Sequence, residues 1–249
     1  MKKTTMARLC GSASSVLILV FLLLLTAHAQ TAPPKPDPET DRVQAMISQA
    51  KKEAEQFSKS GGKDTDAKHP NLKWAATLWQ YRVEHPGTPA TVVATAESLT
   101  LLNRSDRIDE LQAKADTLKL DEPAWQRVIY ILLSGASKTK DYGYVIAKGD
   151  ALAQGAVDPE IKALARFTVG NAYWRKKDIE QARTAFRTVI TEYPKSSYAE
   201  DAEGNLREIE FLNPGQPAPS FERSTINGEP ISMAGFKGKV VVLKFWGTY

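Results

Sequence analysis

Cysteine and histidine, the residues that most often act as nucleophiles or metal ligands, are few in this chain and are not spaced as such sites require. The 249-residue sequence has one cysteine, Cys10, and three histidines, of which His69 and His85 each directly precede a proline. A metal site needs several such ligands at fixed spacings, and no cluster of that kind occurs. The sequence also lacks the G-x-S-x-G motif of a nucleophilic serine and the glycine-rich loops that bind phosphates. It therefore predicts no catalytic, metal-binding or cofactor-binding residue of its own.

Residues 1–29 have the pattern of a secretory signal peptide. A basic start precedes the apolar run 16–25, and an Ala-x-Ala site ends at Ala29. The run is shorter than the roughly 20 residues that span a bilayer. Cleavage after Ala29 predicts an exported protein in a bacterial periplasm, and it removes Cys10, so the mature chain is expected to contain no thiol or disulfide. A membrane partner is expected only if the leader stays uncleaved.

The charge of the chain argues against nucleic acid as a partner. The formal net charge is +4, and most of that excess lies in the leader, which has basic residues and no acidic ones. The remainder is close to neutral, without the basic patch that a polyanion requires.

A proline-rich tether, residues 30–38, is predicted to follow the leader as a semi-rigid spacer. In the next segment, 39–71, apolar residues from Val43 onward recur at alternating spacings of four and three. This spacing predicts one amphipathic helix. Residues 58–71 are rich in glycine, lysine and aspartate and are predicted to form a flexible loop.

Residues 72–212 are repetitive. Four prolines recur every 35 to 37 residues, each before or at the start of a helix-forming stretch: Pro86, Pro123, Pro159 and Pro194. Three aspartates follow basic turns between them and are predicted to cap the second helix of each pair: Asp106, Asp141 and Asp178. A period of this length with two helices per unit predicts a helical-repeat solenoid.

The last full unit resembles a tetratricopeptide repeat. Five residues stand at that pattern's small, aromatic and proline positions: Gly170, Tyr173, Ala182, Phe186 and Pro194. The small residues would let two antiparallel helices approach closely, and the aromatic rings would fill the space beside them. The earlier units lack several of these residues and are degenerate. The resemblance implies a scaffold or docking arm with a protein ligand.

Aromatic residues recur at helical spacing through the same region: Trp74, Trp79, Trp125, Tyr130 and Trp174. Such residues are more often part of a core than of a binding groove, so we expect them in the core and name no ligand-binding residue.

The tail, residues 213–249, departs from the helical pattern. Three prolines and a glycine in 213–221 end the last helix. Alternating residues then flank Asn227-Gly228, a strong hairpin signal. After a short connection, the apolar run 240–245 predicts a strand buried on both faces.

This tail resembles the opening segment of redoxin domains, the AhpC/TSA-like family with a thioredoxin fold, and within it the TlpA/ResA-type thiol-disulfide oxidoreductases. The residues that carry the resemblance are Gly215, Pro217, Pro219, Phe221, Gly228, Gly238, Lys239 and the run Phe245-Trp246-Gly247-Thr248-Tyr249. The last run is similar to the family's F-W-A-T-W, with glycine for alanine and tyrosine for the second tryptophan.

The resemblance implies that a C-x-x-C motif follows Tyr249, at a helix N-terminus that lowers the thiol pKa. Trp246, Thr248 and Tyr249 would flank this site, and no catalytic residue is carried over to the sequence itself. We therefore expect the chain to be truncated just before the motif. Partners of the full-length parent would be protein thiols or disulfides of the cell envelope.

The predicted fold is mainly α: a tetratricopeptide-like solenoid, followed by the hairpin and first core strand of an incomplete α/β thioredoxin fold. Three functions stay open. The first is the N-terminal part of an exported thiol-disulfide oxidoreductase with a helical docking arm. The second is a non-enzymatic binding scaffold. The third is a peroxiredoxin-type antioxidant protein, which the FWGTY run disfavours because peroxidatic sites typically have a loop with proline and threonine before the cysteine.

Overall fold

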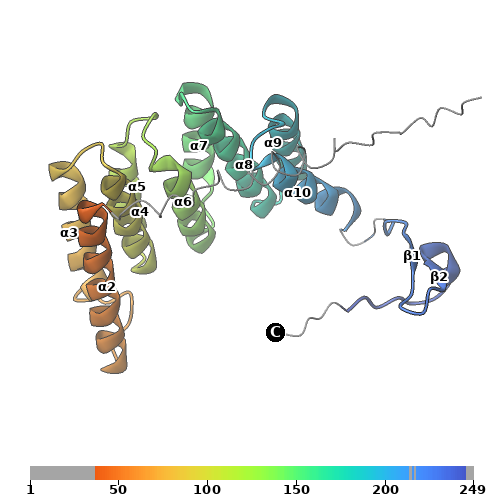
Figure 1. Cartoon of the computed structure of the whole chain (residues 1–249), viewed down its shortest axis with the longest axis horizontal. Coiled ribbons are helices and arrows are strands. Elements are labelled where there is room, and N and C mark those ends of the chain that lie inside the picture. The colour runs from red at the N-terminus through yellow and green to blue at the C-terminus, as the bar shows by residue number, and fades with distance from the viewer. Residues whose placement is uncertain (1–36, 213–214, 216, 245–249) are drawn as a thin grey trace, which may run out of the picture. The chain divides into compact units, whose positions relative to one another are not determined.

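A computed structural model describes residues 37–212, 215 and 217–244 (Figure 1). The helices of this part of the chain are α2 (Pro38–Lys59), α3 (Pro70–Glu84), α4 (Pro89–Arg104), α5 (Ile108–Asp116), α6 (Trp125–Thr139), α7 (Gly143–Gly155), α8 (Pro159–Arg175), α9 (Ile179–Glu192) and α10 (Ala199–Phe211). They are followed by strands β1 (Glu222–Ser224) and β2 (Pro230–Ser232) and by the 3₁₀-helix η1 (Met233–Phe236). The described chain is thus mainly α, as predicted, whereas the predicted signal peptide and most of the predicted tether lie outside it.

Helix packing follows the order of the chain (Figure 1). From α3 to α10 each helix contacts the next one, and in addition α4 contacts α6 and α6 contacts α8. Most buried side chains of α2 to α8 form one apolar cluster, while Phe186, Val189 and Ile209 belong to a second cluster that joins α8, α9 and α10. The core is therefore built from neighbours in sequence.

The first helix confirms the predicted apolar stripe: Val43, Ile47 and Ala50 of α2 are buried. The loop predicted over 58–71 is shorter than expected, since α3 already begins at Pro70. His69 explains the early start, because its Nδ1 caps α3 by accepting the backbone N–H of Asn71 at 3.1 Å.

Three turns between consecutive helices each contain one residue with a left-handed backbone conformation. Asp106, Lys140 and Lys177 have φ values of 54°, 62° and 69°, in the left-handed region that favours glycine. They lie in the turns from α4 to α5, from α6 to α7 and from α8 to α9. A left-handed residue in each turn lets the chain reverse within a few residues, so that consecutive helices can pack together.

The three predicted aspartate caps have different outcomes. Asp178 is the N-cap of α9, and its side chain accepts a bond from Gln181 N. Asp141 lies one residue outside the N-cap of α7 and accepts the N–H of Gly143 at 3.0 Å. The prediction is wrong for Asp106. The N-cap position of α5 is occupied by Arg107, and the carboxylate of Asp106 instead pairs with Lys138 at 2.6 Å.

The large aromatic residues only partly meet the expectation of a core position. Trp125 is fully buried, and Trp74, Trp79 and Trp174 are half-buried. Tyr130 is 38% exposed, contrary to the prediction. Tyr130 is about half a helical turn away from the buried Val128 and Leu132 on α6. Its side chain therefore leaves the helix on the face opposite to these two residues.

In the tail the predicted hairpin forms. β1 and β2 pair antiparallel, with Arg223 opposite Ile231, and Gly228 in the connecting turn has a φ of +83°. The predicted buried strand does not form over residues 240–244. Val240 and Val242 are 95% and 85% exposed, because the described part of the chain provides neither a strand to pair with this run nor layers to cover it.

Candidate functional site

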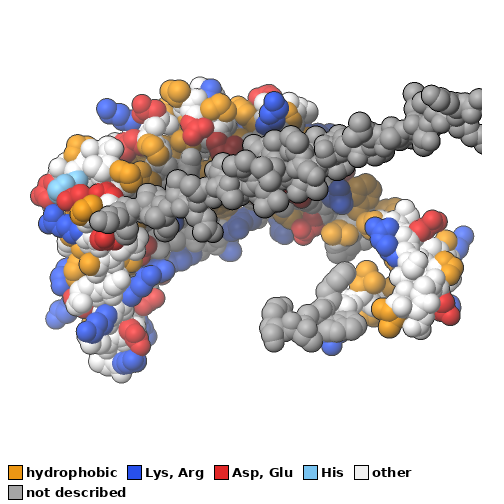
Figure 2. Space-filling view, in the orientation of Figure 1, with side chains coloured by type: hydrophobic (Ala, Val, Ile, Leu, Met, Phe, Trp, Pro, Cys, Tyr) orange, Lys and Arg blue, Asp and Glu red, His pale blue; other side chains and the backbone are white. Residues whose placement is uncertain are grey.

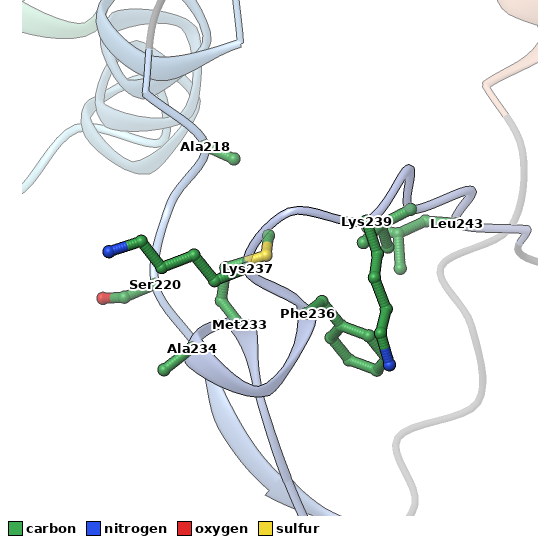
Figure 3. Close-up of a pocket in the computed structure, with 9 residues that line it drawn as sticks. Ala218, Ser220, Met233, Ala234, Phe236, Lys237, Lys239 and Leu243 are labelled. Atoms are coloured by element: carbon green, nitrogen blue, oxygen red, sulfur yellow. The ribbon is translucent and has the colours of Figure 1, made fainter.

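The tail was the region in which sequence reasoning placed the chemistry. Trp246, Thr248 and Tyr249, predicted to flank a redox site, lie outside the described residues. Just before them, a cavity of about 620 Å³ lies within the tail, and Figure 3 shows the residues that line it. It is lined by Ala218, Ser220, Met233, Ala234, Phe236, Lys237, Lys239, Val241 and Leu243. This lining is mostly apolar and holds no thiol or imidazole, so it resembles an uncovered core face more than a reactive centre.

The two histidines of the described chain serve structural contacts. His69 is buried, its Nε2 is 3.4 Å from Asp64 Oδ1, and its ring meets Phe57 edge-on. His85 stacks on Tyr81 with 4.3 Å between ring centroids. Within the described residues no group of three or more histidine, aspartate or glutamate side chains is placed to hold a metal ion.

A second cavity, in the helical part, has more polar side chains in its lining than the tail cavity. Its volume is about 680 Å³. It is lined by Arg82, Pro86, Gly87, Thr88, Pro89, Thr91, Val92, Thr95, Thr117, Lys119, Glu122, Pro123 and Ala124, and is called the Arg82 cavity below. Its walls are the end of α3, the turn into α4, the first turns of α4 and the segment between α5 and α6.

Local sequence explains these walls. Gly87 has a φ of +80°, which allows the tight turn after α3. Thr88 then caps α4, since its hydroxyl accepts the N–H of Thr91 at 3.1 Å, and Pro89 occupies the first turn, where a missing N–H costs nothing. Pro123 similarly precedes the start of α6. These turn and cap residues thus end α3 and start α4 and α6 at the edge of the cavity.

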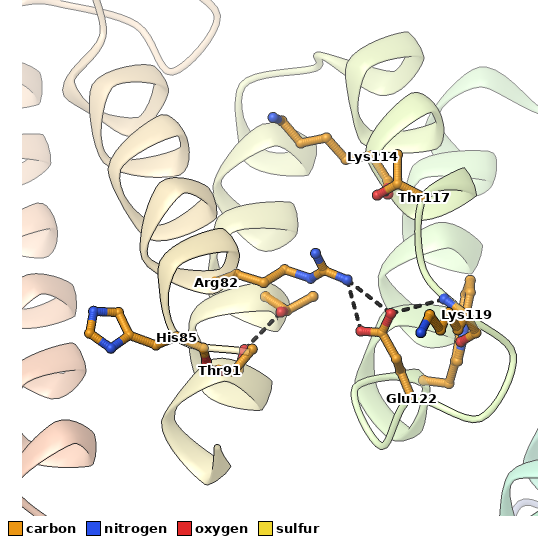
Figure 4. Close-up of polar contacts among 9 residues, drawn as sticks. Arg82, His85, Thr91, Lys114, Thr117, Lys119 and Glu122 are labelled. Carbon is orange, nitrogen blue, oxygen red and sulfur yellow. Dashed lines mark hydrogen bonds and ion pairs between the residues drawn. The ribbon is translucent and has the colours of Figure 1, made fainter. Parts of the chain in front are cut away.

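One ion pair crosses the cavity (Figure 4). Arg82 Nη2 lies 2.9 and 2.8 Å from the two carboxylate oxygens of Glu122, and Glu122 Oε1 also accepts the N–H of Lys119 at 2.9 Å. The side chains of Arg82 and Glu122 are only 16% and 24% exposed. This bridge fixes the α5–α6 segment against the end of α3.

Trp79 supports the guanidinium from the side. Arg82 Cζ lies 4.9 Å from the centroid of the Trp79 ring, and Lys114 Nζ lies 4.7 Å from it. Both are cation–π distances. Arg82 Nε is buried and has no hydrogen-bond partner. The guanidinium is therefore held in place while one of its donors stays unused.

Sequence reasoning did not find this cavity. Arg82 and Glu122 are 40 residues apart, and neither belongs to a motif that chemistry would require. The only local signals were the turn residues around Gly87 and Pro123, which predict loops but not that two loops face each other.

Comparisons with known proteins produced no match: no protein-family model, no curated protein and no solved structure is significantly similar to the chain. Among the described helices none is both long enough and apolar enough to cross a membrane. The function has to be argued from the sequence and the geometry.

Proposed function

We propose that α3 to α10 form a docking arm of degenerate tetratricopeptide-like repeats and that residues 213–249 open a redoxin-type thioredoxin domain. The parent protein would be an exported thiol-disulfide oxidoreductase of the cell envelope. In this proposal the described chain supplies recognition and the start of the second fold, and the redox cysteines follow Tyr249.

The conformation of the tail is the observation that carries the proposal. A hairpin around Asn227-Gly228 leads through η1 into an apolar run, Val240 to Leu243, that is exposed. An apolar run of this kind needs strands on its edges and layers on its faces. The order of hairpin, short connection and apolar run is that of the redoxin opening described from the sequence.

The helical part supports the docking arm. The close contact that the repeat pattern requires is present, since a Cβ added to Gly170 would meet Phe186 Cε1 at 2.6 Å. Ala182, also a small residue of the pattern, is fully buried. Helices that pack mainly on their sequence neighbours form extended surfaces that commonly bind other proteins.

The proposed chemistry is thiol-disulfide exchange. A thiolate attacks one sulfur of a substrate disulfide, the other sulfur leaves as a thiolate, and a second cysteine of the enzyme then resolves the mixed disulfide. The substrate gains two electrons and the enzyme ends as a disulfide. Both cysteines would lie at the helix N-terminus that follows the apolar run.

A second candidate function is binding without catalysis. The Arg82 cavity favours it, because a pre-formed cavity with convergent polar groups can select a ligand on its own. In this case the tail would be a vestigial addition to a binding scaffold.

Disulfide reduction by the protein isolated from its natural source tests the proposal. We expect that protein to reduce the disulfides of insulin and to lose this activity after alkylation under reducing conditions. Residues 30–249, made separately, are the matched control, and their disulfide-reducing activity should not exceed that of buffer. A natural protein that contains no thiol, or that is inactive in its reduced form, would contradict the redox proposal and favour the binding scaffold.

A further inference from the structure

We propose that the Arg82 cavity binds an N-acylated α-amino acid carboxylate. This chemical group occurs at the C-terminus of every peptide and in free N-acylated amino acids. The cavity is built wholly from the helical part of the chain, so the proposal does not depend on a redox function of the tail.

The size and walls of the cavity suit such a group. Its volume of about 680 Å³ lies within the roughly 300–1,000 Å³ typical of small-molecule sites. Apolar atoms come from three prolines and two small aliphatic residues: Pro86, Pro89, Pro123, Val92 and Ala124. These walls can cover one aliphatic side chain.

The charges that face the cavity favour an anion. Arg82 and Lys119 are cationic and Glu122 is anionic, and they are the charged residues of the lining. Because both carboxylate oxygens of Glu122 are already bonded to Arg82, its charge is largely compensated. A net positive lining with the exposed Lys119 at its edge attracts a carboxylate.

Arg82 has a donor to offer. Its Nη2 makes both bonds to Glu122 and its Nε is buried out of a ligand's reach, whereas its Nη1 is neither buried nor hydrogen-bonded within the described residues. A hydrogen bond to a charged acceptor is stronger than one to a neutral acceptor. A ligand carboxylate that reaches the guanidinium would therefore gain a charge-assisted bond.

The threonines of the lining select the rest of the ligand. Thr91 donates its hydroxyl proton to the carbonyl of His85, Thr95 donates to Thr91 O and Thr117 donates to Lys114 O. Each hydroxyl has only one proton, so the oxygen of the exposed Thr117 keeps a lone pair for a ligand. Thr95 is fully buried, and Thr91 Oγ1 already lies 2.9 Å from Thr88 Oγ1. A group that combines a carboxylate with a neighbouring N–H complements both parts of the lining, and an acylated amino acid has this combination.

Calorimetric titration of the whole chain tests the proposal with four probes. The probes are N-acetyl-leucine, an N-acetylated tetrapeptide that ends in leucine, and the C-terminal amide of each. We expect at least one of the two acids to bind, and its amide to bind about tenfold more weakly or worse, since a charge-assisted bond is lost. Binding of the peptide acid alone would assign the group to a peptide C-terminus. Binding of both acids with similar affinity would show that the terminal group suffices.

Paired variants separate recognition from scaffolding. Arg82→Gln should weaken binding of the acid about tenfold, whereas Glu122→Gln should strengthen it, because it removes a competing charge and keeps an acceptor for Arg82. Lys119→Gln, at an exposed position, should weaken binding and keeps the test available if the Arg82 variant does not fold. The matched control is Arg166→Gln, which breaks the 2.6 Å pair with Asp150 outside the cavity and should leave binding unchanged.

Three results would overturn the proposal. The first is that neither acid binds. The second is that the amides bind as well as the acids. The third is that Arg82→Gln and Glu122→Gln weaken binding equally in folded protein, which would make the ion pair a structural bridge only.

Discussion

Gly170 of α8 lies directly against the ring of Phe186 of α9: a Cβ added to Gly170 would approach Phe186 Cε1 to 2.6 Å and Cδ1 to 2.8 Å. The ring is fully buried and has edge or tilted contacts with Trp174 and Phe167. No room is therefore left for even one methyl group at this helix crossing.

Gly170→Ala should destabilise the protein in spite of alanine's better helix propensity. The propensity gain is about 1 kcal/mol, whereas overpacking a fixed ring costs about 1–3 kcal/mol, so we expect a net loss of up to about 2 kcal/mol. Denaturant unfolding followed by circular dichroism measures it. The control is Gly204→Ala in α10, where a new Cβ meets nothing within 4 Å and which should stabilise. Equal effects of both substitutions would contradict the close packing.

Lys140→Gly should stabilise the turn between α6 and α7. Lys140 ends α6 in the left-handed region, with a φ of 62°, where a side chain costs about 1–2 kcal/mol and glycine costs none. The extra freedom of glycine in the unfolded chain offsets about 0.4–1 kcal/mol of this gain. We expect a net gain of up to about 1.6 kcal/mol in the free energy of unfolding. Lys140→Ala, which keeps the strain, is the control and should give no such gain.

The contact that Asp116 of α5 makes with α7 should stabilise the protein in a pH-dependent way. Its carboxylate accepts bonds from Lys148 Nζ at 2.6 Å and from the Tyr144 hydroxyl at 2.8 Å. The bond from Lys148 holds the pKa of Asp116 below its usual 3.8, with help from Tyr144 and against partial burial. Burial, together with Asp116, also raises the pKa of Tyr144 above its ordinary range. The ionised aspartate therefore stabilises the fold above about pH 4, and this contribution is lost as the pH falls through the lowered pKa.

The variant Asp116→Asn measures this contribution. At pH 7 it should cost about 0.5 kcal/mol, because the carboxylate is more than half exposed and solvent screens the pair. The difference from the unmodified chain should shrink as the pH of the denaturant-unfolding experiment is lowered from 7 to 2. Asp121→Asn, at an exposed position, is the control. A difference that persists unchanged at pH 2 would show that the carboxylate's charge does not matter.

Val242→Lys should reduce self-association of the 249-residue chain. Val240, Val242 and Leu243 are 95%, 85% and 64% exposed in a proline-free apolar segment, a composition that promotes aggregation. A lysine in this run breaks it with a charge. Light scattering at increasing concentration compares the two proteins, with the exposed Val83→Lys of α3 as the control. Equal scattering from all three proteins would mean that the run does not drive association.

Local features of the sequence were enough to predict most of the helical part. The stripe that begins at Val43 and the turn around Gly228 depend on neighbouring residues, so their periodicity and turn chemistry apply directly. The predicted cap at Asp106 was wrong, because local features do not decide its role. Its backbone conformation depends on a reversal between two packed helices, and Lys138, on α6, takes its carboxylate.

The candidate site was predictable only in its loops. Turn residues such as Gly87 and Pro123 indicate where helices stop, but the meeting of Arg82 with Glu122 depends on how two helix pairs stack. The apolar run from Val240 shows that composition alone does not predict whether a strand forms. Its composition predicts a buried strand, yet a strand needs partners, and composition does not tell whether the chain described here supplies them.

The most direct measurement is the intact mass of the mature protein from its natural source, together with its free-thiol count after reduction. We expect a chain that starts at Gln30, extends beyond Tyr249 and contains two cysteines one helical turn apart. A mature protein that ends at Tyr249 and has no thiol would contradict the proposed oxidoreductase and leave ligand binding by the helical arm as its activity.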